Sequence, residues 1–129
     1  MIRSIIFSLC LFIPSQVFAG PVNFVCHYPV FSNESGMKKY SKHFQLKIYY
    51  DPATSQAKLI GDGGTAKLKP VLNKDKTAIT FIEVTPSGNV MTITIDTTSK
   101  SVYSRNATVN GQLVASQSYG SCKSLSDSK

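Results

Sequence analysis

The chain has 129 residues, of which 42% are hydrophobic, 16% charged and 10% aromatic. These values fit one ordinary globular domain, because a disordered chain is poorer in apolar residues and a second full domain needs a longer chain. The 14 basic and 7 acidic residues give a formal charge of +7. This charge favours anionic partners and says nothing about the fold.

The first 19 residues have the order of a secretory signal. A single basic residue, Arg3, precedes an apolar run from Ile5 to Ile13, and Val17 and Ala19 stand where a signal peptidase reads small residues. The run is roughly ten residues long, well short of the ~20 that a helix needs to cross a bilayer. We therefore expect residues 1–19 to be removed and the mature protein to be periplasmic or secreted.

Two cysteines remain after this removal, since Cys10 lies inside the predicted signal. Cys26 and Cys122 are an even number in a small exported chain, and an oxidising compartment favours one bridge between them. Closing so long a loop stabilises the fold by roughly 4 to 5 kcal/mol in the chain-entropy account. A disulfide that joins the two ends of the mature domain is therefore predicted.

Apolar and polar residues alternate with a period of two, most clearly from His43 to Tyr50. This pattern is typical of a strand with one buried face, and helical spacing is not seen over a comparable length. Turn residues interrupt the pattern about every ten positions, and Asn110-Gly111 is the preferred pair for a two-residue hairpin. The expected strands are 22–28, 42–50, 56–60, 65–71, 78–84, 90–95, 101–109 and 112–119.

About eight short antiparallel strands joined by tight turns form a meander. To bury its apolar faces, such a meander closes into a small barrel or folds into a two-sheet sandwich. A Cys26–Cys122 bridge brings the two edge strands together, which favours the barrel. The all-β domain is expected over residues 20–122, with a flexible polar tail at 123–129, and the one long connection, Pro29–Ser41, is a candidate functional loop.

No arrangement of catalytic residues or metal ligands is predicted. The two histidines, His27 and His43, are isolated in their segments, most acids fall in predicted turns, and Glu83 alone lies in the middle of a strand. Gly-rich phosphate loops, Cys/His clusters and a nucleophile elbow are not seen either. We expect a protein without enzymatic activity, cofactor, bound metal, transmembrane segment or specific nucleic-acid motif. An enzyme that uses Glu83 or the histidines is the minor alternative.

Lysines gather on neighbouring predicted strands and in the long connection. If the strands pair as a meander, four of them share one outer face and three more extend it. Such a face attracts nucleic acid, lipid phosphate or an acidic glycan, whereas the structural alternative is a set of solvated lysines that prevents edge aggregation. The predicted basic face comprises Lys47, Lys58, Lys67 and Lys69, extended by Lys38, Lys39 and Lys42.

The last predicted hairpin offers a second candidate. A two-residue turn at Asn110-Gly111 fixes the register, so that residues whose numbers sum to 221 face each other. Polar side chains then form a strip on one face, and two larger side chains lie on the other as interface anchors; the alternative is plain cross-strand polar pairing. The strip comprises Ser104, Asn106, Gln117 and Tyr119, and the anchors are Tyr103 and Arg105.

The export signal, a domain of about a hundred residues in short strands, cysteines near both ends and the pair Ser87-Gly88 resemble the layout of the periplasmic lysozyme inhibitors. This resemblance implies inhibition of an extracellular hydrolase and transfers no site residue. Its cationic targets would be repelled by a chain that is itself basic. The leading hypothesis is therefore a non-catalytic exported domain that binds an unknown protein or an anionic polymer.

Overall fold

The computed structural model describes residues 20–125, so the predicted signal and residues 126–129 of the predicted tail lie outside the described residues. Within this range no helix has the length and apolar character needed to cross a membrane. Eight strands follow in chain order: β1 (Val22–Asn33), β2 (Gly36–Asp51), β3 (Gln56–Gly61), β4 (Gly64–Leu72), β5 (Ala78–Val84), β6 (Val90–Asp96), β7 (Lys100–Val109) and β8 (Gln112–Leu125).

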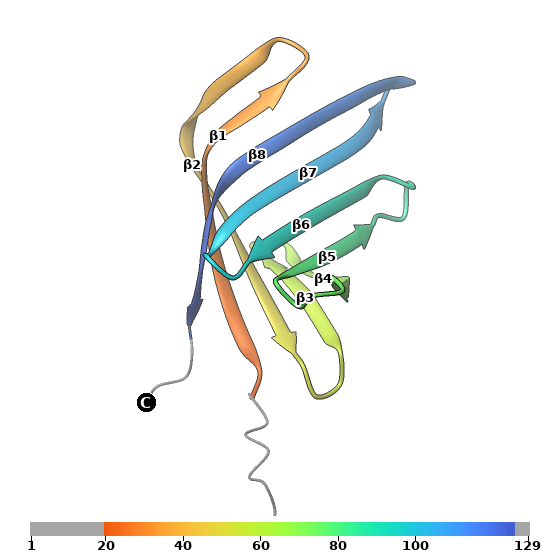
Figure 1. Cartoon of the computed structure of the whole chain (residues 1–129). Helices are drawn as coiled ribbons and strands as arrows, with labels where there is room; N and C mark the ends of the chain where they lie inside the picture. The colour runs from red at the N-terminus through yellow and green to blue at the C-terminus, as the bar shows by residue number, and fades with distance from the viewer. Residues whose placement is uncertain (1–19, 126–129) are drawn as a thin grey trace, which may run out of the picture.

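The strands form a closed antiparallel barrel in which each pairs with its neighbour in sequence and β8 pairs with β1 (Figure 1). The prediction of an all-β meander is confirmed, and the barrel rather than the sandwich is the arrangement found. The two strands of the closing seam and their neighbour β2 are the long ones: β1, β8 and β2 have 12, 14 and 16 residues. β8 continues to Leu125, so Lys123, Ser124 and Leu125 of the predicted tail pair with β1.

The expected loop at Pro29–Ser41 is wrong, because β1 and β2 continue through it as a hairpin that turns at Glu34 and Ser35. The signal that misled the prediction is Pro29, which has no backbone N–H to donate to a ladder. The register of β1 shifts between Tyr28 and Val30 against β2, and between His27 and Val30 against β8. Pro29 therefore lies in a β-bulge, one of the few places where a strand accepts proline.

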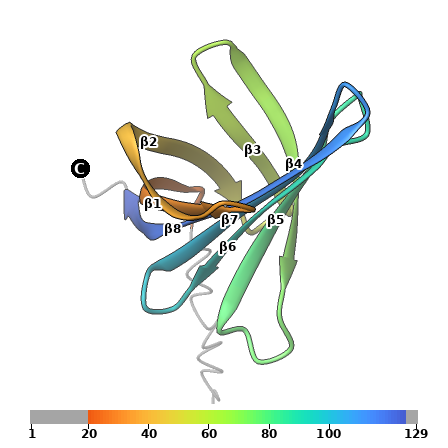
Figure 2. The same cartoon turned by 90° about the horizontal axis from the view of Figure 1, so that it is seen from above.

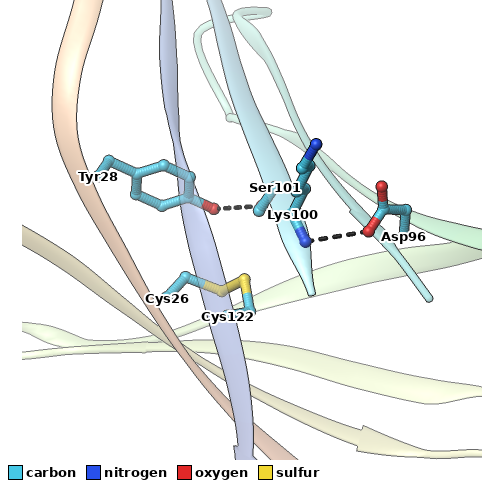
Figure 3. The surroundings of a disulfide bond; sticks show 6 residues. All are labelled: Cys26, Tyr28, Asp96, Lys100, Ser101 and Cys122. Carbon is cyan, nitrogen blue, oxygen red and sulfur yellow. Dashed lines mark hydrogen bonds between the residues drawn. A yellow bond between two sulfur atoms is a disulfide. The ribbon is translucent and has the colours of Figure 1, made fainter. Parts of the chain in front are cut away.

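The inside of the barrel is filled with aliphatic and aromatic side chains. Three aromatic rings form a cluster in it, with the Tyr28, Phe44 and Tyr103 centroids 5.5 to 6.0 Å apart. Burial raises the pKa of Tyr28 to about 12, although its hydroxyl forms a 2.8 Å hydrogen bond with Ser101 Oγ (Figure 3). Every described buried side-chain polar atom has a partner. The barrel is thus a packed core with satisfied hydroxyl groups.

The barrel closes where β1 meets β8. Cys26 lies directly opposite Cys122 and forms the predicted disulfide, which spans 96 residues of sequence (Figure 3). Next to it, Gly120 lies under the bulge of β1, where an added Cβ atom would come within 1.8 Å of the His27 carbonyl oxygen. Because real Cβ atoms do not approach backbone so closely, only glycine permits the two strands to pack here.

Two of the turns between strands have the conformation or the hydrogen bonds that their residues predict. Asn110 and Gly111 both have positive φ, the conformation of a type I′ turn, and every β7–β8 pair sums to 221. At the β6–β7 turn the Asp96 carboxylate accepts hydrogen bonds from Thr98 Oγ1 and from the Thr98 and Lys100 amides. The Thr98 hydroxyl bond is the largest cause that lowers the pKa of Asp96.

We predict that Gly120→Ala destabilises the protein by about 1 to 3 kcal/mol, because the strands must separate to admit the methyl group. The matched control is Gly63→Ala in the β3–β4 turn, where an added Cβ meets nothing within 4 Å. Urea denaturation measures both free energies of unfolding. Equal stability of the two variants would contradict the close approach at the seam.

The disulfide gives a second prediction. Replacement of both Cys26 and Cys122 by alanine should lower the free energy of unfolding by roughly 2 to 5 kcal/mol, since a 96-residue loop is then open in the unfolded chain. Thermal and urea unfolding of this variant and of the oxidised protein measure the difference. A loss below about 1 kcal/mol would show that the strand ladder closes the barrel without help from the bridge.

Candidate anion-binding face

Four lysines project from the outer face of β2, β3 and β4. The buried neighbours Ile48, Ala57 and Leu68 alternate with them and point inward, so all four ammonium groups are on the solvent side. This set, called the lysine face below, comprises Lys47, Lys58, Lys67 and Lys69. The strand pairing thus brings together the four residues that the sequence predicts.

The register places two of these lysines directly opposite each other. Lys58 of β3 pairs with Lys67 of β4, and on its other side Lys58 pairs with Tyr49 of β2. The Lys58 Nζ lies 5.9 Å from the centre of the Tyr49 ring, within the range of a cation–π interaction. Opposed like charges destabilise a sheet, so this pair opposes the stability of the barrel.

Carboxylates do not neutralise these strand segments. Among the acids of the chain, none occurs in residues 45–50, 56–61 or 64–70, and Asp51 and Asp62 lie at strand ends and turns. Beside the lysines, a surface hollow of about 450 Å³ is lined by Lys67 and Lys69 and by apolar residues of β5. The face is therefore cationic with an apolar border.

The three lysines predicted to extend this face lie elsewhere on β2. Lys38 pairs with Phe31 and Lys39 with Val30, in the part of the β1–β2 hairpin beyond the bulge. Lys39 is eight residues from Lys47, about 26 Å along an extended strand. Lys42 is exposed in the irregular segment between these two parts. The structure does not bring Lys38 and Lys39 to the lysine face.

The predicted polar strip forms a second, shallower feature. A surface hollow of about 370 Å³ is lined by Ser104, Asn106 and Gln117 together with residues of the β1–β2 turn. The Tyr119 hydroxyl donates a 2.8 Å hydrogen bond to Gln117 Oε1 and lies 3.4 Å from Ser32 Oγ. The strip therefore lies on one face as predicted, and two of its members already bond to each other.

The predicted anchors lie on the inner side of β7. Tyr103 is only 9% exposed and packs in the core, and its hydroxyl is 2.9 Å from Met91 Sδ. Burial is the main cause that raises the pKa of Tyr103; the charge of Arg105 lowers it and that of Glu83 raises it. Arg105 itself is exposed. A buried tyrosine is part of the core packing, so its role as an anchor has no structural support.

Two candidate catalytic residues of the minor alternative, Glu83 and His27, lie on strands that do not pair with each other. Glu83 is half-buried opposite Met91 on β5, whereas His27 is exposed on β1, opposite Gln45 and Ser121. His43 belongs to β2. Across residues 20–125, no three His, Cys, Asp or Glu residues are grouped so that they could hold a metal ion.

Sequence reasoning missed two openings beside the β3–β4 hairpin. β2 pairs with β3 only from Lys47 onward, and β4 pairs with β5 only from Lys69 onward. A cleft of about 750 Å³ lies beside the hairpin tip on the β2 side, and the 450 Å³ hollow lies along β4 on the β5 side. The glycines at 61, 63 and 64 were the available signal, and they suggested only a turn.

Comparison with protein-family models, with curated proteins and with solved structures finds no match to this chain. The resemblance to lysozyme inhibitors therefore stays a prediction based on layout.

The Lys58–Lys67 pair generates a stability prediction. Lys67→Glu replaces a like-charge pair by a cross-strand ion pair, so the free energy of unfolding should rise by about 0.5 to 1 kcal/mol at low salt. Lys74→Glu in the β4–β5 loop makes the same change in net charge away from the pair. Urea unfolding of both variants at low and high salt tests the difference. An equal effect of both substitutions would show that Lys58 and Lys67 do not repel each other measurably.

Proposed function

We propose that this protein is an exported, non-catalytic β-barrel domain that binds an anionic polymer of the cell envelope or its surroundings through the lysine face. One observation carries the proposal: Lys58 and Lys67 oppose each other on an outer face whose strand segments contain no acid. A like-charge pair costs stability in the free protein, and a bound polyanion removes this cost.

The spacing of the lysine face supports a polymer with repeated charges. Lys67 and Lys69 are two residues apart on one strand, which separates their Cα atoms by about 7 Å. Across the ladder, the Cβ atoms of the opposed Lys58 and Lys67 are about 5 Å apart. A lysine ammonium is a compact charge without the fork geometry of arginine, so such a face recognises charge density more than the shape of one group. An acidic polysaccharide has that character.

The disulfide supports the compartment in this proposal. A Cys26–Cys122 bridge at the barrel seam is typical of proteins in oxidising compartments. The acid-free strands and the excess of basic over acidic residues also favour association with negatively charged material by long-range attraction.

Binding to heparin as a model acidic polysaccharide tests the proposal. The dissociation constant should rise with ionic strength, and the slope of log K against log salt should correspond to about four released ions. A Lys58→Ala and Lys67→Ala double variant should weaken binding at least tenfold and reduce this slope by roughly two. Calorimetry or fluorescence titration between low and high salt provides the constants.

The matched control is Lys74→Ala with Lys76→Ala, which removes two exposed lysines of the β4–β5 loop. This variant has the same net charge as the first and an intact lysine face, so we expect a change below threefold. If the two double variants lose affinity equally, attraction depends on net charge alone and the proposed site is wrong. Affinity that does not respond to salt would also overturn it.

A further inference from the structure

The barrel wall is open between β2 and the β3–β4 hairpin. Figure 2 shows the hairpin extending away from β1 and β2 as the barrel is viewed from above. The last pair between β2 and β3 is Lys47 with Ile60, and beyond it the two strands diverge around the cleft of about 750 Å³. This opening lies between β2 and the tip of the β3–β4 hairpin.

The β2 side of the cleft has a free strand edge. Phe44, Gln45 and Leu46 pair with β1 on one side, and in the described structure no strand pairs with them on the other. Every second residue of such a segment directs its N–H and C=O groups away from β1, toward the cleft. An unpaired edge of this kind is a template for another strand.

The side chains that line the cleft alternate between the inner and the outer face of the barrel. Phe44 and Leu46 of β2 and Leu59 of β3 are on the inward side and are partly buried against the core. On the outward side the cleft is bordered by Gln45 and Lys47. A strand placed here would therefore meet an apolar inner wall and a polar, cationic outer wall.

We infer that this cleft binds an extended segment of a partner protein, which adds to β2 as a strand and whose side chains alternate between apolar and acidic. Main-chain hydrogen bonds to the free edge supply affinity, and the alternating walls supply specificity. The acidic side chains would lie on the side of Lys47; Asp62 at the hairpin tip also lines the cleft. Along β2 the Phe44–Lys47 edge measures about 13 Å, the length of four residues.

This inference does not rest on the proposed binding of a polyanion, because the free edge of β2 and the apolar inner wall carry it, and Lys47 is the one member of the lysine face that lines the cleft. A capped seven-residue peptide of alternating valine and glutamate is the probe. Titration by calorimetry should give saturable one-to-one binding, and amide hydrogen exchange should slow at residues 44–46 of β2. The Lys58 and Lys67 double alanine variant should bind this peptide within threefold of the unaltered protein.

Backbone methylation of the probe separates strand addition from simple attraction. Methyl groups on all valine amides block one edge of the peptide, and methyl groups on all glutamate amides block the other, while the side chains stay the same. Loss of at least tenfold in affinity for either methylated peptide, or for both, supports pairing with a strand edge. Equal binding of all three peptides would overturn the inference.

A substitution in the cleft gives an independent test. Ala66→Phe places a ring among the lining residues and should weaken peptide binding at least tenfold, whereas Ala53→Phe in the exposed β2–β3 turn should not. If Ala66→Phe does not fold, the hydrogen-exchange measurement on the unaltered protein decides. Absence of slowed exchange at residues 44–46 overturns the inference, and so does a dimer that the peptide dissociates, since the occupant is then a second copy of this chain.

Discussion

The pairing of the first strand with the last is the constraint on which the rest of this structure depends. β1 and β8 lie at opposite ends of the chain, and without their ladder the meander would be an open sheet with two free edges. Two features join them: the Cys26–Cys122 bridge and the absence of a side chain at Gly120, where the His27 carbonyl approaches. The bulge at Pro29 bends β1 at this point, and the aromatic rings pack inside the closed wall.

Closure determines which surfaces the protein presents. Once the apolar residues of β2, β3 and β4 point inward, their alternate neighbours must point outward, and the register aligns Lys58 with Lys67. The opposed pair costs stability, since one acidic residue at position 67 would relieve the repulsion. The outer face and the core are thus two consequences of one alternating pattern.

Much of the fold follows from local signals. The period of two and the turn residues predict eight strands in nearly the observed places, and Asn110-Gly111 predicts the register of the last hairpin to the residue. The hairpin at Pro29–Ser41 could not be predicted, because a bulge depends on the strands that pair on both sides of Pro29. The lysine face follows from the meander, but the place of Tyr103 in the core depends on barrel closure, and the clefts depend on where two ladders stop.

The β3–β4 hairpin is held mainly at its base, the end away from its turn. Ala57 and Leu68 hold that base in the core, while the larger cleft lies beside the tip near Gly61 and Gly64. The smaller hollow lies on the β5 side, along Lys67–Pro70 of β4. Lys58 and Lys67 belong to this hairpin, whereas Lys47 belongs to β2. A movement of the hairpin relative to β2 would therefore change the spacing between Lys47 and the other two cations, so the cleft and the lysine face share one structural element.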